Sequence, residues 1–104
     1  MKTEKSFDME KGNIFEDALT KWGENAQYDQ TIEEMAELTV ALNKLKRLKA
    51  GEKRDEKKTY DNLFTEIADV KVCIEELEFM LGKENVQQAY ARQLEKFKKE
   101  LYDE

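Results

Sequence analysis

The chain has 104 residues, which is enough for one compact domain. It contains no histidine and a single cysteine, so a histidine-built zinc site, an imidazole base and an internal disulfide are all excluded. Its four glycines are isolated, which rules out the phosphate-binding motifs G-x-x-x-x-G-K-[ST] and G-x-G-x-x-G. The net charge of -6 disfavours a nucleic-acid partner. The chain has no long apolar run and no apolar leader, so we expect a cytoplasmic protein without a membrane partner.

The absence of proline and the 40% of charged residues favour long helices, and we predict an all-α fold in one domain over residues 1–104. Capping residues and glycines place helices at about 13–22, 25–50, 59–81 and 85–104. Residues 1–12 either extend the first helix or fray. Residues 51–58 contain no apolar side chain and predict an exposed connection. Four helices with short links are typical of a four-helix bundle-like subunit.

The second predicted helix carries apolar residues on two faces. One stripe contains Ile32, Met35, Thr39 and Leu42, and the other contains Leu38, Ala41, Leu45 and Leu48. A small bundle needs one apolar face per helix, so we expect the surplus face to pack against another copy of the chain. The aromatic and aliphatic residues expected in the core are Phe15, Leu63, Phe64, Ile67, Tyr90 and Phe97.

Two pairs of acids stand out by their setting. Five acid pairs have i,i+3 spacing, roughly the number that chance gives for this composition. However, Glu34 and Glu37 continue the stripe of Leu38 towards the start of its helix, and Glu66 and Asp69 precede an apolar stripe on the next helix. These four carboxylates should therefore point inward, where uncompensated charge costs several kcal/mol per group.

A divalent cation would compensate these inward carboxylates. No lysine or arginine falls on either stripe between the pairs, and a site built from carboxylates alone suits Mg²⁺, with Mn²⁺ as a substitute. The alternative is that these acids are ordinary charges on the helix surface beside the bundle seam.

The order of the acids resembles a known family. Glu33, Glu34 and Glu37 form EExxE, and Glu66 and Asp69 form ExxD after 28 intervening residues. With the neighbouring stretches TIEEMAELTVAL and NLFTEIADVKVCIEEL, the chain resembles the MazG-like all-α nucleoside triphosphate pyrophosphohydrolases over about residues 14 to 81. This superfamily also includes dimeric dUTPases, dCTP pyrophosphatases and phosphoribosyl-ATP pyrophosphohydrolases.

The resemblance implies a homodimer or homotetramer that cleaves the α–β phosphoanhydride of a small nucleotide substrate to the monophosphate and pyrophosphate. It implies a role in trimming the nucleotide pool. Glu34, Glu37, Glu66 and Asp69 would be the metal ligands. Glu33 would be the additional acid, and the general base is Glu33, Glu34 or Glu37.

Other residues supply candidates for substrate contacts. Cations for the triphosphate oxygens would be Lys44, Arg47, Lys58 and Arg92, with ordinary solubility charge as the alternative for each. Trp22 is a candidate for stacking on a base, or else an apolar anchor, and Asn62 is a candidate for reading a base edge.

Two other functions are compatible with these residues. The same fold could act on dUTP, dCTP or phosphoribosyl-ATP. The chain could also be a helical assembly or regulatory module without catalysis, although it carries the complete set of motif acids.

Overall fold

The computed structural model describes residues 3–103, except for the side chain of Lys5, and consists of four helices. They are α1 (Glu4–Trp22), α2 (Glu24–Lys49), α3 (Glu56–Leu81) and α4 (Lys83–Tyr102). The described residues contain no strand, so the prediction of an all-α chain with four helices is confirmed. No described helix combines the length and apolar composition required to cross a membrane.

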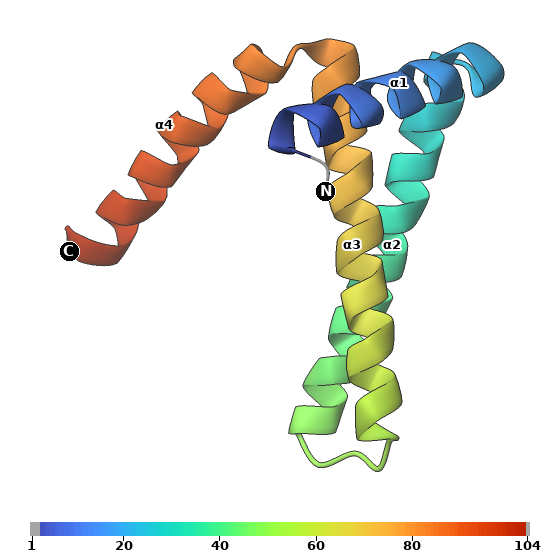
Figure 1. The fold of residues 1–104 in the computed structure, drawn as a ribbon. Helices are drawn as coiled ribbons and strands as arrows, with labels where there is room; N and C mark the ends of the chain where they lie inside the picture. Colours follow the sequence, from blue (N-terminus) through green and yellow to red (C-terminus); the bar gives the residue numbers. More distant parts are fainter. Residues whose placement is uncertain (1–2, 104) are drawn as a thin grey trace.

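The helices α2 and α3 form a long antiparallel hairpin that carries most of the packing (Figure 1). The helix α1 lies across the end of this hairpin, opposite the connecting loop. Among the described residues, α4 contacts only α3 and extends away from the hairpin. The candidate site must therefore be built mainly from α2 and α3.

Three glycines with positive φ mark the helix junctions. Gly23 has φ 88° and donates its N–H to Leu19 O at 2.9 Å, which ends α1 and turns the chain directly into α2. Gly51 has φ 98° in the hairpin loop, and Gly82 has φ 107° between α3 and α4. A left-handed conformation strains residues with a Cβ, so glycine allows these short junctions.

Some helix starts differ from the predicted positions. The helix α1 begins at Glu4 because the Thr3 hydroxyl accepts from Ser6 N at 3.1 Å, so residues 4–12 extend the helix. The helix α3 begins three residues earlier than predicted because the Asp55 carboxylate accepts from Lys58 N at 3.0 Å. The helix α4 begins at Lys83, directly after Gly82, so the predicted cap at residue 85 was wrong.

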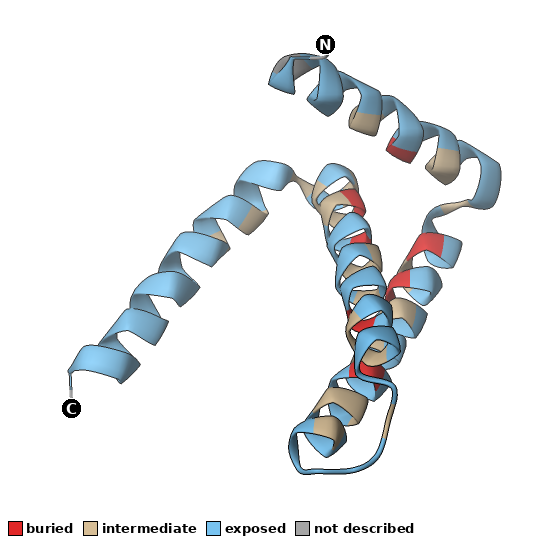
Figure 2. Cartoon of the chain, turned by 60° about the horizontal axis from the view of Figure 1, so that its bottom comes forward, coloured by how far each residue is buried: buried red, intermediate tan, exposed pale blue. Residues whose placement is uncertain are grey.

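The core of the single chain is narrow and follows the facing sides of α2 and α3 (Figure 2). Its buried apolar residues are Phe15, Ala41, Leu63 and Cys73, and its buried polar residues are Gln27, Thr31 and Glu76. On α2, the stripe that contains Ala41 faces this core, whereas Ile32, Met35 and Leu42 of the other stripe are exposed. The prediction that only one of the two stripes packs within the chain is therefore confirmed.

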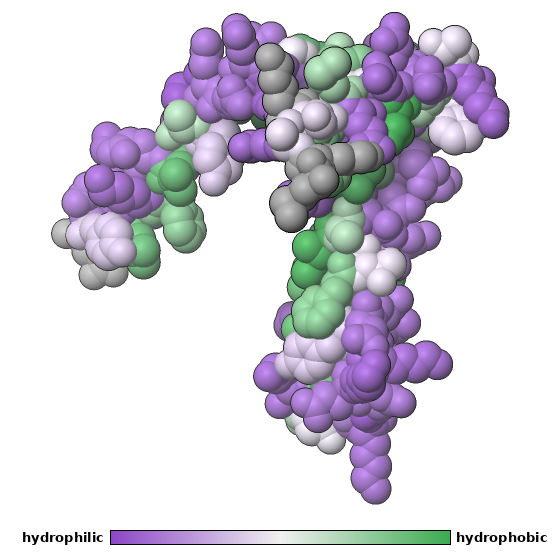
Figure 3. All heavy atoms as spheres, in the orientation of Figure 1, coloured by the Kyte–Doolittle hydropathy of each residue, from purple (hydrophilic) through white to green (hydrophobic). Residues whose placement is uncertain are grey.

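Apolar side chains are also exposed on α3 and α4. Phe15 and Leu63 are buried as expected. Phe64, Ile67, Tyr90 and Phe97 were predicted to be core residues but are exposed in the single chain. Figure 3 shows hydrophobic side chains along one side of α4 and on the outer surface of α3. The amphipathic pattern of α4 correctly identifies an apolar face, but α4 diverges from the hairpin and this face is uncovered.

We predict that Leu63→Ala lowers the free energy of unfolding by about 2–4 kcal/mol, because it removes a buried side chain from the α2–α3 interface. Urea unfolding followed by circular dichroism measures the change. Leu81→Ala on α3 is the matched control, and its exposed side chain should contribute less than about 0.5 kcal/mol. Equal losses in the two variants would contradict the core described above.

Candidate metal centre

Three carboxylates converge at the middle of the α2–α3 hairpin. Glu34 and Glu37 lie one turn apart on α2, and Glu66 lies on α3. One oxygen of each carboxylate lies within 4.8 Å of one oxygen of each of the others. Glu34 and Glu66 are half-buried, but Glu37 is exposed, so the prediction that all four acids point inward was wrong for Glu37. The cluster therefore lies at the edge of the helix interface and is open to solvent on one side.

Two of these carboxylates have a buried oxygen without a hydrogen-bond partner. They are Oε2 of Glu34 and Oε2 of Glu66, the two such side-chain atoms among the described residues. The other oxygen of Glu34 accepts from Gln30 Nε2 at 2.7 Å. A buried acceptor without a partner is costly, and the cost is greater for a charged group. These two oxygens are therefore suited to a cationic partner.

The electrostatics of Glu34 reflect its crowded position. Partial burial, together with the negative charges of Glu37 and Asp69, raises the pKa of this carboxyl above its ordinary value. Asp69 is half-buried, one turn beyond Glu66 on α3. Its oxygens are not part of the three-carboxylate cluster, but its charge acts on the same site. All four predicted metal ligands thus lie at one place in the hairpin.

A cavity separates α1 from the start of α2 and the second half of α3. This α1 cavity has a volume of about 330 Å³. Its lining residues are Ile14, Phe15, Ala18, Trp22, Gln27, Gln30, Glu34, Asp69, Val72, Cys73 and Glu76. Trp22 therefore lies beside the same cavity as two of the predicted metal ligands. The predicted stacking residue and the acid cluster are neighbours in the fold.

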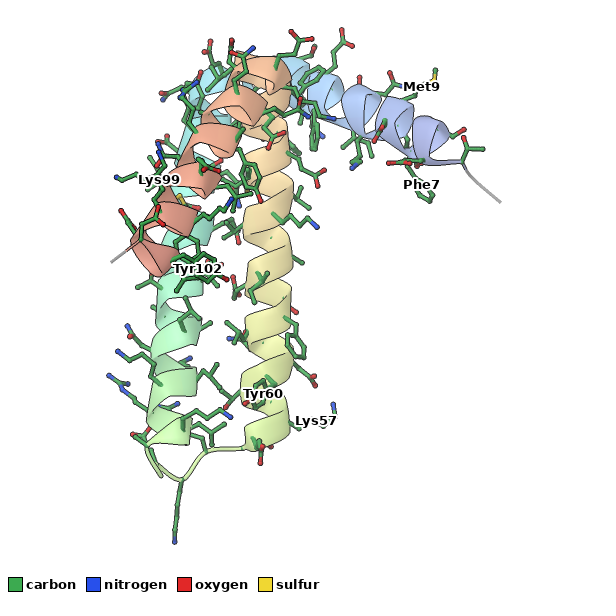
Figure 4. The ribbon with its side chains drawn as sticks, turned by 90° about the vertical axis from the view of Figure 1, so that its left-hand side faces the viewer. Phe7, Met9, Lys57, Tyr60, Lys99 and Tyr102 are labelled. Atoms are coloured by element: carbon green, nitrogen blue, oxygen red, sulfur yellow. The ribbon has the colours of Figure 1, made fainter. Side chains whose placement is uncertain are left out.

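A second cavity lies at the loop end of the hairpin and is rich in basic residues. This loop cavity has a volume of about 440 Å³ and is lined by Lys44, Arg54, Asp55, Lys58, Thr59 and Asn62. It brings together three of the predicted substrate-binding residues, Lys44, Lys58 and Asn62. Figure 4 shows the neighbouring Lys57 projecting away from the hairpin, where it pairs with Asp61 at 2.6 Å.

The remaining predicted site residues lie outside these features. Glu33 is exposed on α2 beside the cluster and is not one of its converging carboxylates. Arg47 is exposed on α2 and lines neither cavity. Arg92 is exposed on α4, which contacts only α3 among the described helices. Within one chain, the structure brings neither arginine to the acid cluster.

Sequence reasoning missed a buried polar pair in the α1 cavity. With its amide nitrogen turned towards the carboxylate, Gln27 donates to Glu76 Oε1 at 2.8 Å and to Oε2 at 3.2 Å. Burial raises the pKa of Glu76. The helical spacing from Glu66 and Asp69 through Cys73 to Glu76 is the signal that could have identified this inward acid.

Cys73 lies beside this pair and is buried. Burial is the main factor that raises the pKa of its thiol. A thiol with a raised pKa is protonated at neutral pH and is a poor nucleophile. Cys73 therefore serves as a small apolar residue in the cavity wall.

Comparisons of the chain with protein-family models, with curated proteins and with solved structures find no significant match. The geometry of the site therefore carries the functional argument together with the acid motifs.

We predict that Glu34→Gln stabilises the metal-free protein at pH 7. The pKa of Glu34 is raised in the folded chain, so ionisation opposes folding. The contribution of Glu34 to the wild-type free energy of unfolding should fall as pH rises from the unfolded pKa, about 4.3, through the higher folded pKa. The variant has no such ionisation, so the difference between its free energy of unfolding and that of the wild type should become smaller towards pH 4. Urea unfolding in EDTA at both pH values measures the difference.

Glu75→Gln is the matched control, because Glu75 pairs with Lys11 of α1 at 3.0 Å and is not part of the three-carboxylate cluster. Removing this ion pair should leave stability level or slightly reduced at pH 7. A Glu34→Gln variant that is less stable than the wild type at pH 7 would indicate that Glu34 makes a structural hydrogen bond instead.

Proposed function

We propose that this chain is a nucleotide pyrophosphohydrolase that uses Mg²⁺, or Mn²⁺ as a substitute. The reaction is hydrolysis of the α–β phosphoanhydride of a nucleoside triphosphate to the monophosphate and pyrophosphate. The observation that carries the proposal is the convergence of Glu34, Glu37 and Glu66 with two buried oxygens that have no hydrogen-bond partner. The resemblance of EExxE and ExxD to the MazG-like motifs supports the same reaction.

The residues at the cluster fit a hard divalent cation. They offer oxygen donors from two helices, and the solvent-exposed side of Glu37 leaves room for further oxygen ligands. Glu34, Glu37 and Glu66 would hold the ion, with Asp69 as the fourth acid. A bound divalent cation offsets negative charge on phosphate oxygens and makes water easier to deprotonate.

The acids of α2 also supply the proton acceptor. A carboxylate of Glu33, Glu34 or Glu37 would take the proton from the attacking water as the bond between the α and β phosphates breaks. Gln30 donates to Glu34 at 2.7 Å and so restricts the orientation of that carboxylate. Pyrophosphate leaves with the electrons of the broken P–O bond.

The two cavities on either side of the cluster suit the two ends of a nucleotide. The α1 cavity offers an aromatic side chain, Trp22, for the base. The loop cavity offers Lys44 and Lys58 for the outer phosphates, with Asn62 beside them. Lys44 follows Glu37 by about 10 Å along the axis of α2. A lysine side chain at this distance can extend towards phosphates bound at the cluster.

The exposed apolar residues support assembly with further copies of the chain. Ile32, Met35 and Leu42 on α2, and Tyr90, Leu94 and Phe97 on α4, are exposed in the single chain. Rows of exposed apolar side chains of this kind are candidates for an interaction site. We therefore include a homodimer or homotetramer in the proposal. Such an assembly would also allow Arg92 of a second copy to approach the cluster.

We predict that the protein releases pyrophosphate from one or more of a panel of ribonucleoside and deoxyribonucleoside triphosphates with Mg²⁺ or Mn²⁺, and not with EDTA. Glu37→Gln should reduce the rate by more than the roughly 10–100-fold typical of losing a hydrogen-bond partner of a metal ligand. Glu75→Gln should keep the wild-type rate, since it removes the same charge away from the cluster.

Release of phosphate in place of pyrophosphate would contradict the proposed bond cleavage. Absence of any metal-dependent release from nucleoside triphosphates, dUTP and dCTP included, and from phosphoribosyl-ATP would contradict the proposed enzyme. The helical assembly module would then be favoured.

A further inference from the structure

The α1 cavity contains a buried carboxylate next to a buried amide. Glu76 on α3 has a relative exposure of 7%, and Gln27 on α2 has 6%. Both line the cavity, and the amide of Gln27 donates to the carboxylate of Glu76. Neither residue belongs to the acid cluster. Their position in the wall of a cavity distinguishes them from a polar pair enclosed by core residues.

The carboxylate of Glu76 has acceptor capacity to spare. A carboxylate has about four lone-pair positions, and one amide nitrogen supplies at most two N–H donors. No described lysine or arginine lines this cavity. Within the described residues, Gln27 is the side chain that donates to Glu76. A ligand that brings further N–H donors would therefore satisfy a buried charged acceptor.

The other walls suit a flat aromatic ring. Phe15 and Trp22 from α1 and Val72 from α3 provide apolar contact surface. A volume of about 330 Å³ lies at the lower end of the range for small-molecule pockets, so the cavity suits a base better than a complete nucleotide. Glu34 and Asp69 also line it, so a base in this cavity would place its sugar and phosphates towards the acid cluster.

We infer that the α1 cavity selects a guanine base, with Glu76 accepting hydrogen bonds from the N1–H and the exocyclic N2 amine. This inference rests on the proposed function and specifies its substrate class. Guanine presents two adjacent donors on one edge. Adenine and cytosine present a donor beside a ring acceptor, and uracil and thymine present one donor between two carbonyls. A carboxylate attracts the first arrangement and repels the acceptors of the others.

Gln27 acts as a positioning residue in this arrangement, because its amide holds both oxygens of the Glu76 carboxylate. Trp22, which lines the same cavity and is 60% exposed, provides a face for the base. Because Trp22 is the only tryptophan in the chain, its fluorescence reports directly on occupancy of the cavity.

The test is a titration of the intact protein in EDTA with dGMP and dIMP, followed by Trp22 emission, with dAMP and dCMP as further ligands. The base of dIMP differs from guanine only in lacking the N2 amine. We expect dGMP to bind about 10-fold more tightly than dIMP, as the loss of one hydrogen bond to a charged group implies. Glu76→Gln should bring this ratio close to one. Glu84→Gln, at an exposed position in the first turn of α4, is the control with the same charge change and should keep the wild-type ratio.

Equal affinities of the wild type for dGMP and dIMP would overturn the inference, and this comparison needs no variant. Tighter binding of dAMP or dCMP than of dGMP, or no change in Trp22 emission with any of the four, would also overturn it. A folded Glu76→Gln protein that keeps the full preference for dGMP would exclude Glu76 as the selecting group.

The proposed hydrolysis can fail independently of this inference. Discrimination between dGMP and dIMP without metal-dependent pyrophosphate release would support the guanine-binding site and contradict the proposed hydrolysis. Metal-dependent pyrophosphate release with no preference for guanine would support the proposed hydrolysis and contradict the selection of guanine by Glu76.

Discussion

The α2–α3 interface carries more negative charge than its own residues neutralise. Glu34 and Glu66 each place an oxygen in this interface without a hydrogen-bond partner, and Glu76 lies buried further along α3. No described lysine or arginine forms an ion pair with any of the three. Buried acids normally require a partner, and the bound cation and base proposed above would supply one in this part of the hairpin.

Because of the position of α1, these acids lie in two different environments. Gly23 turns the chain directly from α1 into α2, so α1 lies across the end of the hairpin and forms one wall of the α1 cavity. Glu76 faces that cavity together with apolar walls, whereas Glu37 remains open to solvent. A hard cation would suit the open, oxygen-rich cluster, and a planar ring with N–H donors would suit the α1 cavity with its apolar walls. In the proposed function, the phosphates of the nucleotide would lie at the cluster and its base in the α1 cavity.

Helical spacing, read together with the apolar stripes, predicted which acids lie near one another but not that Glu37 is exposed. Glu34 and Glu66 lie in register with the apolar stripes of their helices, so packing those stripes together also brings the acids together. The same spacing could not show that Gln27 and Glu76 line a cavity, because that depends on where α1 crosses the hairpin. It also could not show that Phe97 is exposed, because an amphipathic pattern indicates a face to be covered and not which chain covers it. The start of α3 was missed because Asp55, its cap, lies within a charged stretch that favoured a loop.

The most direct test of this account is the binding of Mn²⁺ followed by electron paramagnetic resonance, because free Mn²⁺ gives a signal that decreases on binding. We predict a saturable loss of free Mn²⁺ signal in the wild type, competed by Mg²⁺, and a much weaker loss in a variant with Glu34 and Glu66 both replaced by glutamine. If the wild type and this double variant bind Mn²⁺ equally, or if neither binds it, the acid cluster is not a cation site and the central claim is wrong.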